Sequence, residues 1–196
     1  MRRGLLTRRL RAAGTDRVVG LDLDPVQVER ALSAAGGSPQ ETGLTYASGD
    51  VLAPLPVLAS PFDLVTTVAT LHHLPLEAGL RRLRALVAPG GTLAVVGLTQ
   101  PRTAWDWAVS AAAVPAAKIA RRRRGEWEHG SPIAKVTTSH AELRRAVRDI
   151  LPGARLRRRL YWRYTLVWRA PWGEPSSGGE DDATRRTAGG LLRRGR

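Results

Sequence analysis

The sequence predicts an α/β protein with a doubly wound, mostly parallel sheet, and three observations lead to this prediction. The first half alternates short, continuously apolar runs with stretches whose apolar residues recur at helical spacing. Continuous apolar runs are typical of strands that are buried on both faces of a parallel sheet. The second half ends in two short runs that fit an antiparallel hairpin. Alternating strands and helices place helices on both faces of the sheet.

The first 35 residues predict a helix, a strand and a second helix. The first helix has an apolar face formed by Leu6, Leu10 and Ala13. Gly14 follows it as a common helix stop. Residues 17–23 then form an apolar run, for which we expect a buried strand at Val18–Leu21. Asp24 is placed to cap the next helix, Pro25–Ala35, with proline at its first position.

Residues 44–98 predict three further strands and one helix. The strands are expected at 44–48, 62–68 and 92–98, with Leu64–Val68 and Leu93–Val96 parallel to the first strand. Between the first two of these strands, the proline-rich stretch 53–61 predicts a loop with a short helical turn. The helix is predicted over Leu76–Val87, ahead of Pro89, Gly90 and Gly91.

The remainder predicts an insert, a capped helix, a hairpin and a tail. Residues 101–120 have a helical pattern that breaks at Pro115, and 101–138 is expected to form a variable lid. Ser139 and Glu142 form a capping-box pattern at the start of a helix over His140–Leu151. Strands are expected at 154–160 and 163–168, with Trp162, Tyr164 and Trp168 mostly in the core. We expect one domain over 1–171 and a disordered tail over 172–196.

The composition excludes several classes of protein and leaves one question open. The chain has no cysteine, so disulfides and thiolate metal sites are excluded, and we expect a cytoplasmic protein. No apolar run is long enough to span a bilayer, and residues 1–14 lack the features of a signal peptide. The formal net charge of +14 invites a nucleic-acid partner. Because almost all basic residues are arginine, we favour instead a compositional bias spread over the surface.

Four segments, in this order, resemble the class I S-adenosylmethionine-dependent methyltransferases, especially their small-molecule branch. Residues 18–24 are similar to the family's second strand, which ends in an acid. Residues 49–51 are similar to the loop after the third strand. Residues 62–65 with 71–74, and then 86–93, resemble the fourth strand with its following segment and the turn into the fifth. The resemblance covers roughly residues 4–170 and implies a Rossmann-like fold.

The resemblance implies S-adenosylmethionine as the cofactor and a set of residues that bind it. In the family, the acid at Asp22 accepts from both ribose hydroxyls, and the acid at Asp50 accepts from the adenine amino group. The residue at Val51 packs on the adenine ring. The expected cofactor-binding residues are Gly4, Asp22, Leu23, Asp50, Val51, Thr67 and Val68. From the residues alone, Asp22 could instead cap a helix, Asp50 could be a turn residue and Val68 plain core.

One departure from the family pattern concerns the glycine-rich cofactor loop. The family opens with a strand followed by Gly-x-Gly-x-Gly, whereas here only Gly4 fits, as the last glycine, and Arg2 falls at the middle one. The family's first strand lies between its second and fourth, so we expect a slot in the sheet with two rows of unpaired backbone groups. Such a slot predicts a destabilised chain. A start codon placed too far downstream, or a truncated and inactive remnant, would each explain it.

Two adjacent histidines are the candidate catalytic residues. His72 and His73 lie beyond a predicted parallel strand, where such folds place ligands, and one could remove a proton from an oxygen or nitrogen acceptor. The alternative is that they pack in a loop between strand and helix. No further ligand stands nearby in sequence, so we expect no metal site. Three tryptophans of the insert could line an apolar acceptor pocket or pack within a lid: Trp105, Trp107 and Trp127.

The leading functional hypothesis is methyl transfer to a small-molecule acceptor. Direct displacement at a sulfonium methyl depends on alignment, so it requires no dedicated catalytic side chain. Nucleic-acid methylation is favoured instead if the arginine clusters at 8–11, 121–124 and 155–159 form one face. A third hypothesis is a degenerate remnant that acts only as a binding domain. A dehydrogenase is disfavoured because no residues of a hydride-transfer site are recognisable.

Overall fold

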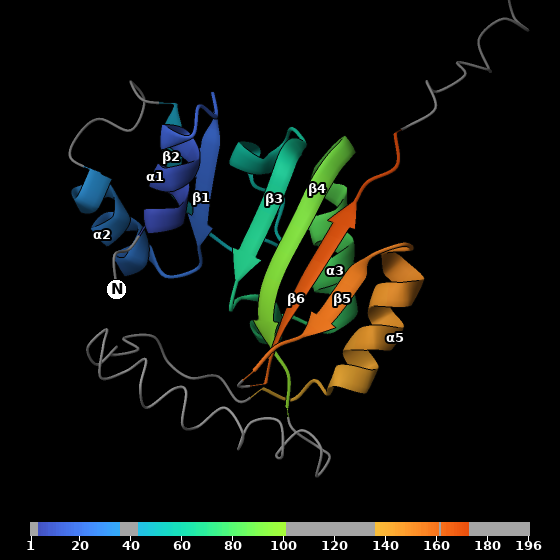
Figure 1. Ribbon diagram of the computed structural model, residues 1–196. Coiled ribbons are helices and arrows are strands. Elements are labelled where there is room, and N and C mark those ends of the chain that lie inside the picture. Colours follow the sequence, from blue (N-terminus) through green and yellow to red (C-terminus); the bar gives the residue numbers. More distant parts are fainter. Residues whose placement is uncertain (1–3, 36–42, 101–135, 161, 173–196) are drawn as a thin grey trace, which may run out of the picture.

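The computed structural model of the chain describes residues 4–35, 43–100, 136–160 and 162–172 (Figure 1). The helices are α1 (Leu5–Ala12), α2 (Pro25–Ala35), α3 (Leu76–Ala85) and α5 (His140–Ile150). The strands are β1 (Val18–Asp22), β2 (Leu44–Ser48), β3 (Phe62–Val68), β4 (Val87–Leu98), β5 (Arg155–Arg158) and β6 (Arg163–Arg169). Two short 3-10 turns, η1 (Pro56–Leu58) and η2 (Leu71–His73), complete the described elements.

The strands form two separate sheets. In the smaller sheet β1 pairs with β2, and in the larger one the order is β3-β4-β6-β5. The β1–β2 and β3–β4 pairs are parallel, whereas β4–β6 and β5–β6 are antiparallel. Figure 1 shows β1 and β3 pointing the same way. The predicted parallel sheet with a closing hairpin is therefore confirmed, and so is the Rossmann-like α/β class.

A break in hydrogen bonding lies between β1 and β3. Among the described residues, β1 is paired with β2 alone and β3 with β4 alone, so each has one edge outside any ladder. This is the place where the sequence predicted a slot, because the family's first strand lies between these two. The expected slot is thus present in the structure, and the two edges that flank it are not joined by backbone hydrogen bonds.

Two arginine side chains connect the smaller sheet and its following loop to the larger sheet. Arg82 on α3 donates from Nε to the carbonyl of Val51, at 2.9 Å, and from Nη2 to the carbonyl of Ala53, at 3.3 Å. Arg17, just ahead of β1, donates to the carbonyl of Val57 at 3.1 Å. The same guanidinium lies over the ring of Phe62 on β3, 5.1 Å from its centroid. Side-chain contacts therefore connect the two sheets, whereas backbone hydrogen bonds connect neighbouring strands within each sheet.

The main core lies on one face of the larger sheet. Helices α3 and α5 both contribute to this core, and Figure 1 shows α3 behind the strands and α5 next to β5. Alternate residues of the strands point into it, so that Leu93 and Leu166 have no exposed surface. Leu80 of α3 is equally buried between helix and sheet. Helices α1 and α2 instead cover the smaller sheet.

Local hydrogen bonds explain where two helices begin. Ser139 Oγ accepts from the amide of Glu142 at 3.2 Å, and the Glu142 carboxylate accepts from the amide of Ser139 at 2.7 Å, so the predicted capping box is confirmed. Asp24 Oδ1 accepts from the amide of Val26 at 2.9 Å, which confirms the predicted cap of α2. These caps fix the helix ends that face the carboxyl ends of the parallel strands.

Several predicted boundaries differ from the structure. Helix α3 ends at Ala85 rather than Val87, because Val87 already pairs with Phe62 at the start of β4. Gly90, with φ of 73°, bends this long strand instead of preceding it. Trp162 is not core: it occupies the hairpin turn with φ of 57° and is 39% exposed, whereas Tyr164 and Trp168 are buried as expected.

Other predictions fall outside the described residues. They include residues 101–135 of the expected lid with its three tryptophans and arginine run, the glycines at 36 and 37, and the tail beyond Trp172. Within the described ranges, no helix combines the length and the apolar character that crossing a bilayer requires.

The unpaired edge of β1 predicts uneven protection from hydrogen exchange. A two-stranded sheet is marginal on its own, whereas β4 has a strand on both sides and a packed face. We expect the amides of Val19 and Leu21 to exchange at least about tenfold faster than those of Val95 and Leu166. Mass spectrometry of exchanged peptides measures this difference. Equal protection of β1 and β4 would show that the β1 edge is covered.

Candidate functional site

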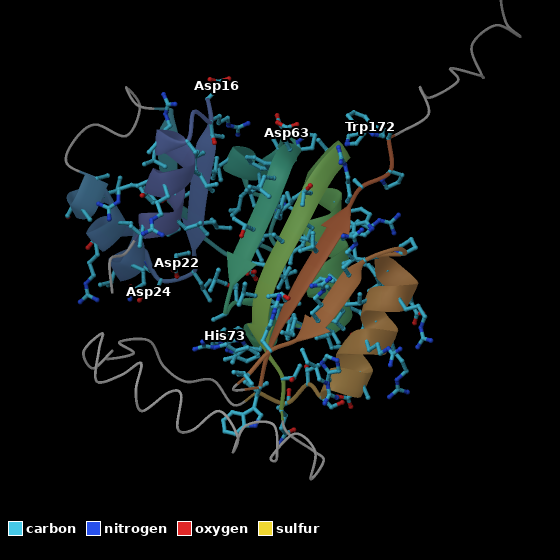
Figure 2. All side chains as sticks on the ribbon, in the orientation of Figure 1. Asp16, Asp22, Asp24, Asp63, His73 and Trp172 are labelled. Atoms are coloured by element: carbon cyan, nitrogen blue, oxygen red, sulfur yellow. The ribbon has the colours of Figure 1, made fainter. Side chains whose placement is uncertain are left out.

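The candidate site lies between β1 and β3, the two strands from which the chain continues toward opposite sides. From β1 the chain continues outward to β2, whereas from β3 it continues to β4 on the other side. Open α/β sheets bind ligands outside the carboxyl ends of the strands at such a reversal. Figure 2 shows Asp22, Asp24 and His73 at this end of the molecule and Asp16 and Asp63 at the opposite end. The predicted site residues of the first and second sheets therefore share one edge.

The two acids at the end of β1 have different hydrogen bonds. Asp24 accepts through Oδ1 from the amide of Val26 and through Oδ2 from the side chain of Gln27, at 2.9 and 3.1 Å. Asp22 accepts through Oδ1 from the amide of Asp24 at 3.0 Å, and no described residue donates to its Oδ2. Asp22 is exposed at the strand end. Asp24 is thus committed to the helix cap, while Asp22 keeps an oxygen for an external donor.

Asp50 reaches the same edge from β2. The amide of Gly49 donates to the carbonyl of Asp22 at 3.0 Å, which ties the two strand ends together. Asp50 is exposed, and its Oδ1 accepts from the amide of Leu52 at 2.9 Å. This bond is the turn role that the residue type alone allows. Its second oxygen receives no hydrogen bond from a described residue. Asp50 therefore stabilises the turn with one oxygen and can accept from a ligand with the other.

The two apolar residues that follow these acids differ in exposure. Leu23 is 74% exposed, beyond the end of β1. Val51 is half-buried, and its carbonyl is held by Arg82. Large exposed apolar side chains beside available acceptors are a common feature of ligand sites.

Gly4 begins α1 in a conformation that favours glycine. Its φ is 66°, and a Cβ there would lie 2.5 Å from the hydroxyl oxygen of Tyr46 on β2. The Tyr46 hydroxyl is 2.7 Å from Thr7 Oγ1, which donates to the carbonyl of Gly4 at 2.7 Å. Tyr46 thereby anchors the first turn of α1 to the smaller sheet.

Sequence reasoning did not identify Tyr46. In the β1–β2 register it is the partner of Gly20, and a Cβ on Gly20 would lie 2.8 Å from the tyrosine ring. The tyrosine can cross β1 toward α1 only because this strand position has no side chain. A glycine inside a strand indicates such a close approach, so Gly20 was the available signal.

The end of β3 contributes the second side of the site. Thr67 Oγ1 is buried and has no hydrogen-bond partner among the described residues, whereas Val68 is 52% exposed. The next residue, Ala69, has φ of 54°, in the left-handed region that costs a residue with a Cβ about 1 kcal/mol. Strained backbone of this kind is concentrated at functional sites. The Ala69 amide donates to the carbonyl of Val96 at 2.7 Å, which holds the bend against β4.

The histidine pair follows this bend in η2. The rings of His72 and His73 are 4.1 Å apart between centroids and tilted by 36°. His72 Nδ1 is buried with no partner among the described residues, while His73 is exposed. Burial, and then the adjacent His73, lower the pKa of His72 below its ordinary value. A neutral imidazole can accept a proton, so His72 has the protonation state that a general base needs.

The described residues fit the nucleoside part of S-adenosylmethionine better than its methionine part. Two carboxylates on adjacent strand ends, Asp22 and Asp50, each have an oxygen that can accept from hydroxyl or amino groups of a nucleoside. For the methionine half, the described residues supply Gly4 and the first turn of α1, which presents backbone amides. Within the described ranges, no three His, Asp or Glu side chains come together as a metal site would require.

Known proteins that are similar to this chain include methyltransferases. A family model for a methyltransferase domain matches residues 2–95. Uncharacterized methyltransferases of Mycobacterium tuberculosis and Mycobacterium bovis are 39% identical over 180 residues, which cover 86% of this chain and 83% of each relative.

Two of the solved structures with a similar fold concern methyltransferases. The magnesium protoporphyrin IX methyltransferase of Synechocystis with bound SAH matches with a TM-score of 0.51 at 22% identity, over 85% of this chain and 69% of that one. A chain in the complex of the Trm112 methyltransferase activator with a putative methyltransferase, from Haloferax volcanii, matches with a TM-score of 0.57 at 19% identity. That match covers 87% of this chain and 79% of the other. These likenesses show the fold.

The lowered pKa of His72 predicts a pH dependence of stability. The unfolded chain binds a proton at this residue near pH 6.5, whereas the folded chain does so only at lower pH. The stability that neutral His72 contributes is therefore complete above about pH 6.5 and is lost as the pH falls through the folded pKa. Thermal melts between about pH 7.5 and 5 should show a smaller loss in His72→Gln than in the wild type. The exposed neighbour gives a matched variant, His73→Gln, which should keep most of the loss. Identical profiles for wild type and His72→Gln would contradict the assignment.

Proposed function

The chain belongs to the class I S-adenosylmethionine-dependent methyltransferases, and from this membership we propose that it transfers a methyl group from S-adenosylmethionine to an O, N or C atom of a small-molecule acceptor. One observation of the site carries the proposal. Asp22 and Asp50 stand at the carboxyl ends of adjacent parallel strands, each with a carboxylate oxygen toward which no described residue donates. They do so at the reversal of strand order, where α/β sheets bind nucleotides.

The residues divide between the parts of the cofactor. Asp22 would accept from the ribose hydroxyls and Asp50 from the adenine amino group, with Leu23 and Val51 packing against the nucleoside. Gly4, at the start of α1, would approach the methionine portion. Thr67 and Val68 would flank it from β3, through backbone and packing. When bound, the cofactor supplies a methyl group activated by its sulfonium. The SAH bound in the Synechocystis enzyme, which has a similar fold, supports this choice of cofactor.

The acceptor side of the site would be provided by β3 and η2. Methyl transfer by displacement needs an acceptor atom in line with the methyl group, so positioning contributes much of the rate. An oxygen or nitrogen acceptor must also lose a proton. His72, which burial keeps neutral, would accept that proton directly or through the adjacent His73. The site thus combines a nucleoside-binding side and a proton-accepting side.

The arrangement of arginines disfavours nucleic-acid methylation. That alternative required the clusters at 8–11, 121–124 and 155–159 to form one face. Among the described residues, the first cluster belongs to α1 on the smaller sheet and the third to β5 and the residue after it, at the far edge of the larger sheet. Figure 1 shows them on opposite sides of the molecule. They do not form the continuous cationic face that tracking a phosphate backbone requires.

The break between β1 and β3 favours a second candidate function, a binding domain without catalysis. The two halves of the candidate site belong to different sheets, and a poorly fixed separation between them would raise the barrier to transfer, because misplacement of about 1 Å can cost about 100-fold in rate. In that case the nucleoside side would still bind ligand. Assays of binding and of turnover separate the two candidates.

Substitution of the two acids at the end of β1 tests the cofactor assignment. Asp22→Ala should weaken S-adenosylmethionine binding about tenfold to several hundredfold, because it removes charge-assisted hydrogen bonds to ribose. The matched variant Asp24→Ala should instead cost about 1 kcal/mol of stability through loss of the α2 cap, with little direct effect on affinity. Calorimetric titrations and thermal melts measure both effects.

The reverse pattern would contradict the assignment in a specific way. If Asp24→Ala abolished binding while Asp22→Ala left it intact, the ribose would be held two residues later than proposed. If neither variant changed binding, the nucleoside would not lie at this edge, and the proposed function would fail.

A further inference from the structure

One face of the larger sheet is not covered by any described element. Helices α3 and α5 pack on the opposite face, and α1 and α2 pack on the smaller sheet. Figure 1 is viewed onto the open face, across β3, β4, β6 and β5. Because side chains alternate between the faces of a strand, every second residue of these four strands belongs to it.

The β3–β4 side of the open face is mostly apolar, with Thr66 and Thr92 as its polar positions. Its members include Leu64, Val68 and Val96, which are 44%, 52% and 37% exposed, with Val167 of β6 beside them at 46%. In the ladder Val68 is the partner of Val96, so these side chains are neighbours. A sheet face turned to water normally has polar residues at these positions. Contiguous exposed apolar side chains on one sheet face mark an interaction surface.

The β6–β5 side of the same face is cationic. Arg155 and Arg157 of β5 are partners of Val167 and Thr165 in the ladder, and both arginines are exposed. Arg159 donates to the Thr165 hydroxyl at 3.2 Å, so its side chain also reaches this face. The four strands contain a single acid, Asp63, at the amino end of β3. The cations of β5 therefore have no acidic counterpart on the strands around them.

We propose that this open face docks an amphipathic, acidic helix of a partner protein. The apolar stripe of such a helix would lie on Leu64, Val96 and Val167, as α3 and α5 lie on the opposite face of the same sheet. Carboxylates along one flank of the helix would face Arg155 and Arg157. Apolar contact over β3–β4 would give affinity, and charge complementarity over β5–β6 would give orientation and selectivity.

The charges and the apolar strip distinguish this occupant from two others. A second copy of the chain would bring a further formal charge of +14 to a face that is itself cationic. A nucleic-acid backbone would pair with the arginines but would leave Val96 and Val167 against phosphates and water. A helix that is apolar on one side and acidic on a flank satisfies both halves of the face.

Binding of designed peptides to the full chain tests the proposal. The probe is a fluorescein-labelled amphipathic helix of about 20 residues with a leucine stripe and a glutamate flank, and its control has lysine at every glutamate. Fluorescence anisotropy should show saturable binding of the acidic peptide, weakened about tenfold or more by Arg155→Glu with Arg157→Glu. Val96→Thr with Val167→Thr should weaken it about fivefold, because apolar contact is lost without a change of charge.

A matched variant on the covered side provides the control. Arg144→Glu with Arg148→Glu makes the same change of charge at exposed positions of α5, and it should alter affinity by no more than about twofold. None of these residues belongs to the candidate methyl-transfer site, so S-adenosylmethionine affinity serves as the check that each variant is folded. Circular dichroism provides the same check independently of cofactor binding.

Five results would overturn the proposal. Equal losses in the β5 and α5 variants, or equal binding of the lysine peptide, would show that net charge or apolar surface alone attracts the probe. Absence of saturable binding would show that the face does not accept a helix. Dimerisation in sedimentation experiments that Val96→Thr with Val167→Thr abolishes would assign the face to a second copy. Tighter peptide binding after removal of residues 173–196 would assign it to the chain's own C-terminal segment.

Discussion

The candidate site depends on how two separate sheets are held together. The side proposed to bind the nucleoside belongs to β1 and β2, and the side proposed to accept a proton belongs to β3 and the turn that follows it. No strand ladder joins them among the described residues, so their spacing rests on side chains. Arg82 fixes the loop that begins after Asp50, and Arg17 links the start of β1 to η1 and to Phe62. These few hydrogen bonds are partly exposed, and such contacts are individually weak. Any ligand that touches both sides would stabilise their arrangement.

The sequence predicted the parts of the fold that local patterns control. The strands at 44–48 and 62–68 have the predicted bounds, because each is a short segment of strand-forming residues between turn-forming residues. Asp24 and Ser139 cap helices as expected, since capping depends on a few neighbouring residues. The slot was also predicted from the sequence, because the family has a strand between the two that correspond to β1 and β3. Local chemistry and family order were sufficient for these features.

The errors arose where a contact distant in sequence decides the outcome. Val87 has the spacing of a helical residue, but pairing with Phe62 draws it into β4. Tyr46 was missed because its role depends on Gly20, a cross-strand partner that periodicity does not identify. The open, half-apolar and half-cationic face could not be predicted either. The face is open because α1 and α2 cover the smaller sheet, and this follows from the pairing of β1 with β2.

We propose that β1 and β2 form the nucleoside side of the cofactor site and that the break between β1 and β3 limits cofactor binding. Replacing residues 1–3 with a strand-forming segment followed by Gly-x-Gly-x, so that Gly4 becomes the last glycine of Gly-x-Gly-x-Gly, tests this, and a Gly/Ser segment of equal length is the control. Calorimetric titration with S-adenosylmethionine compares both with the original chain. We expect only the strand-and-glycine segment to raise the affinity, by about tenfold or more, because it fills the slot and supplies backbone amides to the methionine portion. Equal affinity in all three proteins would contradict it.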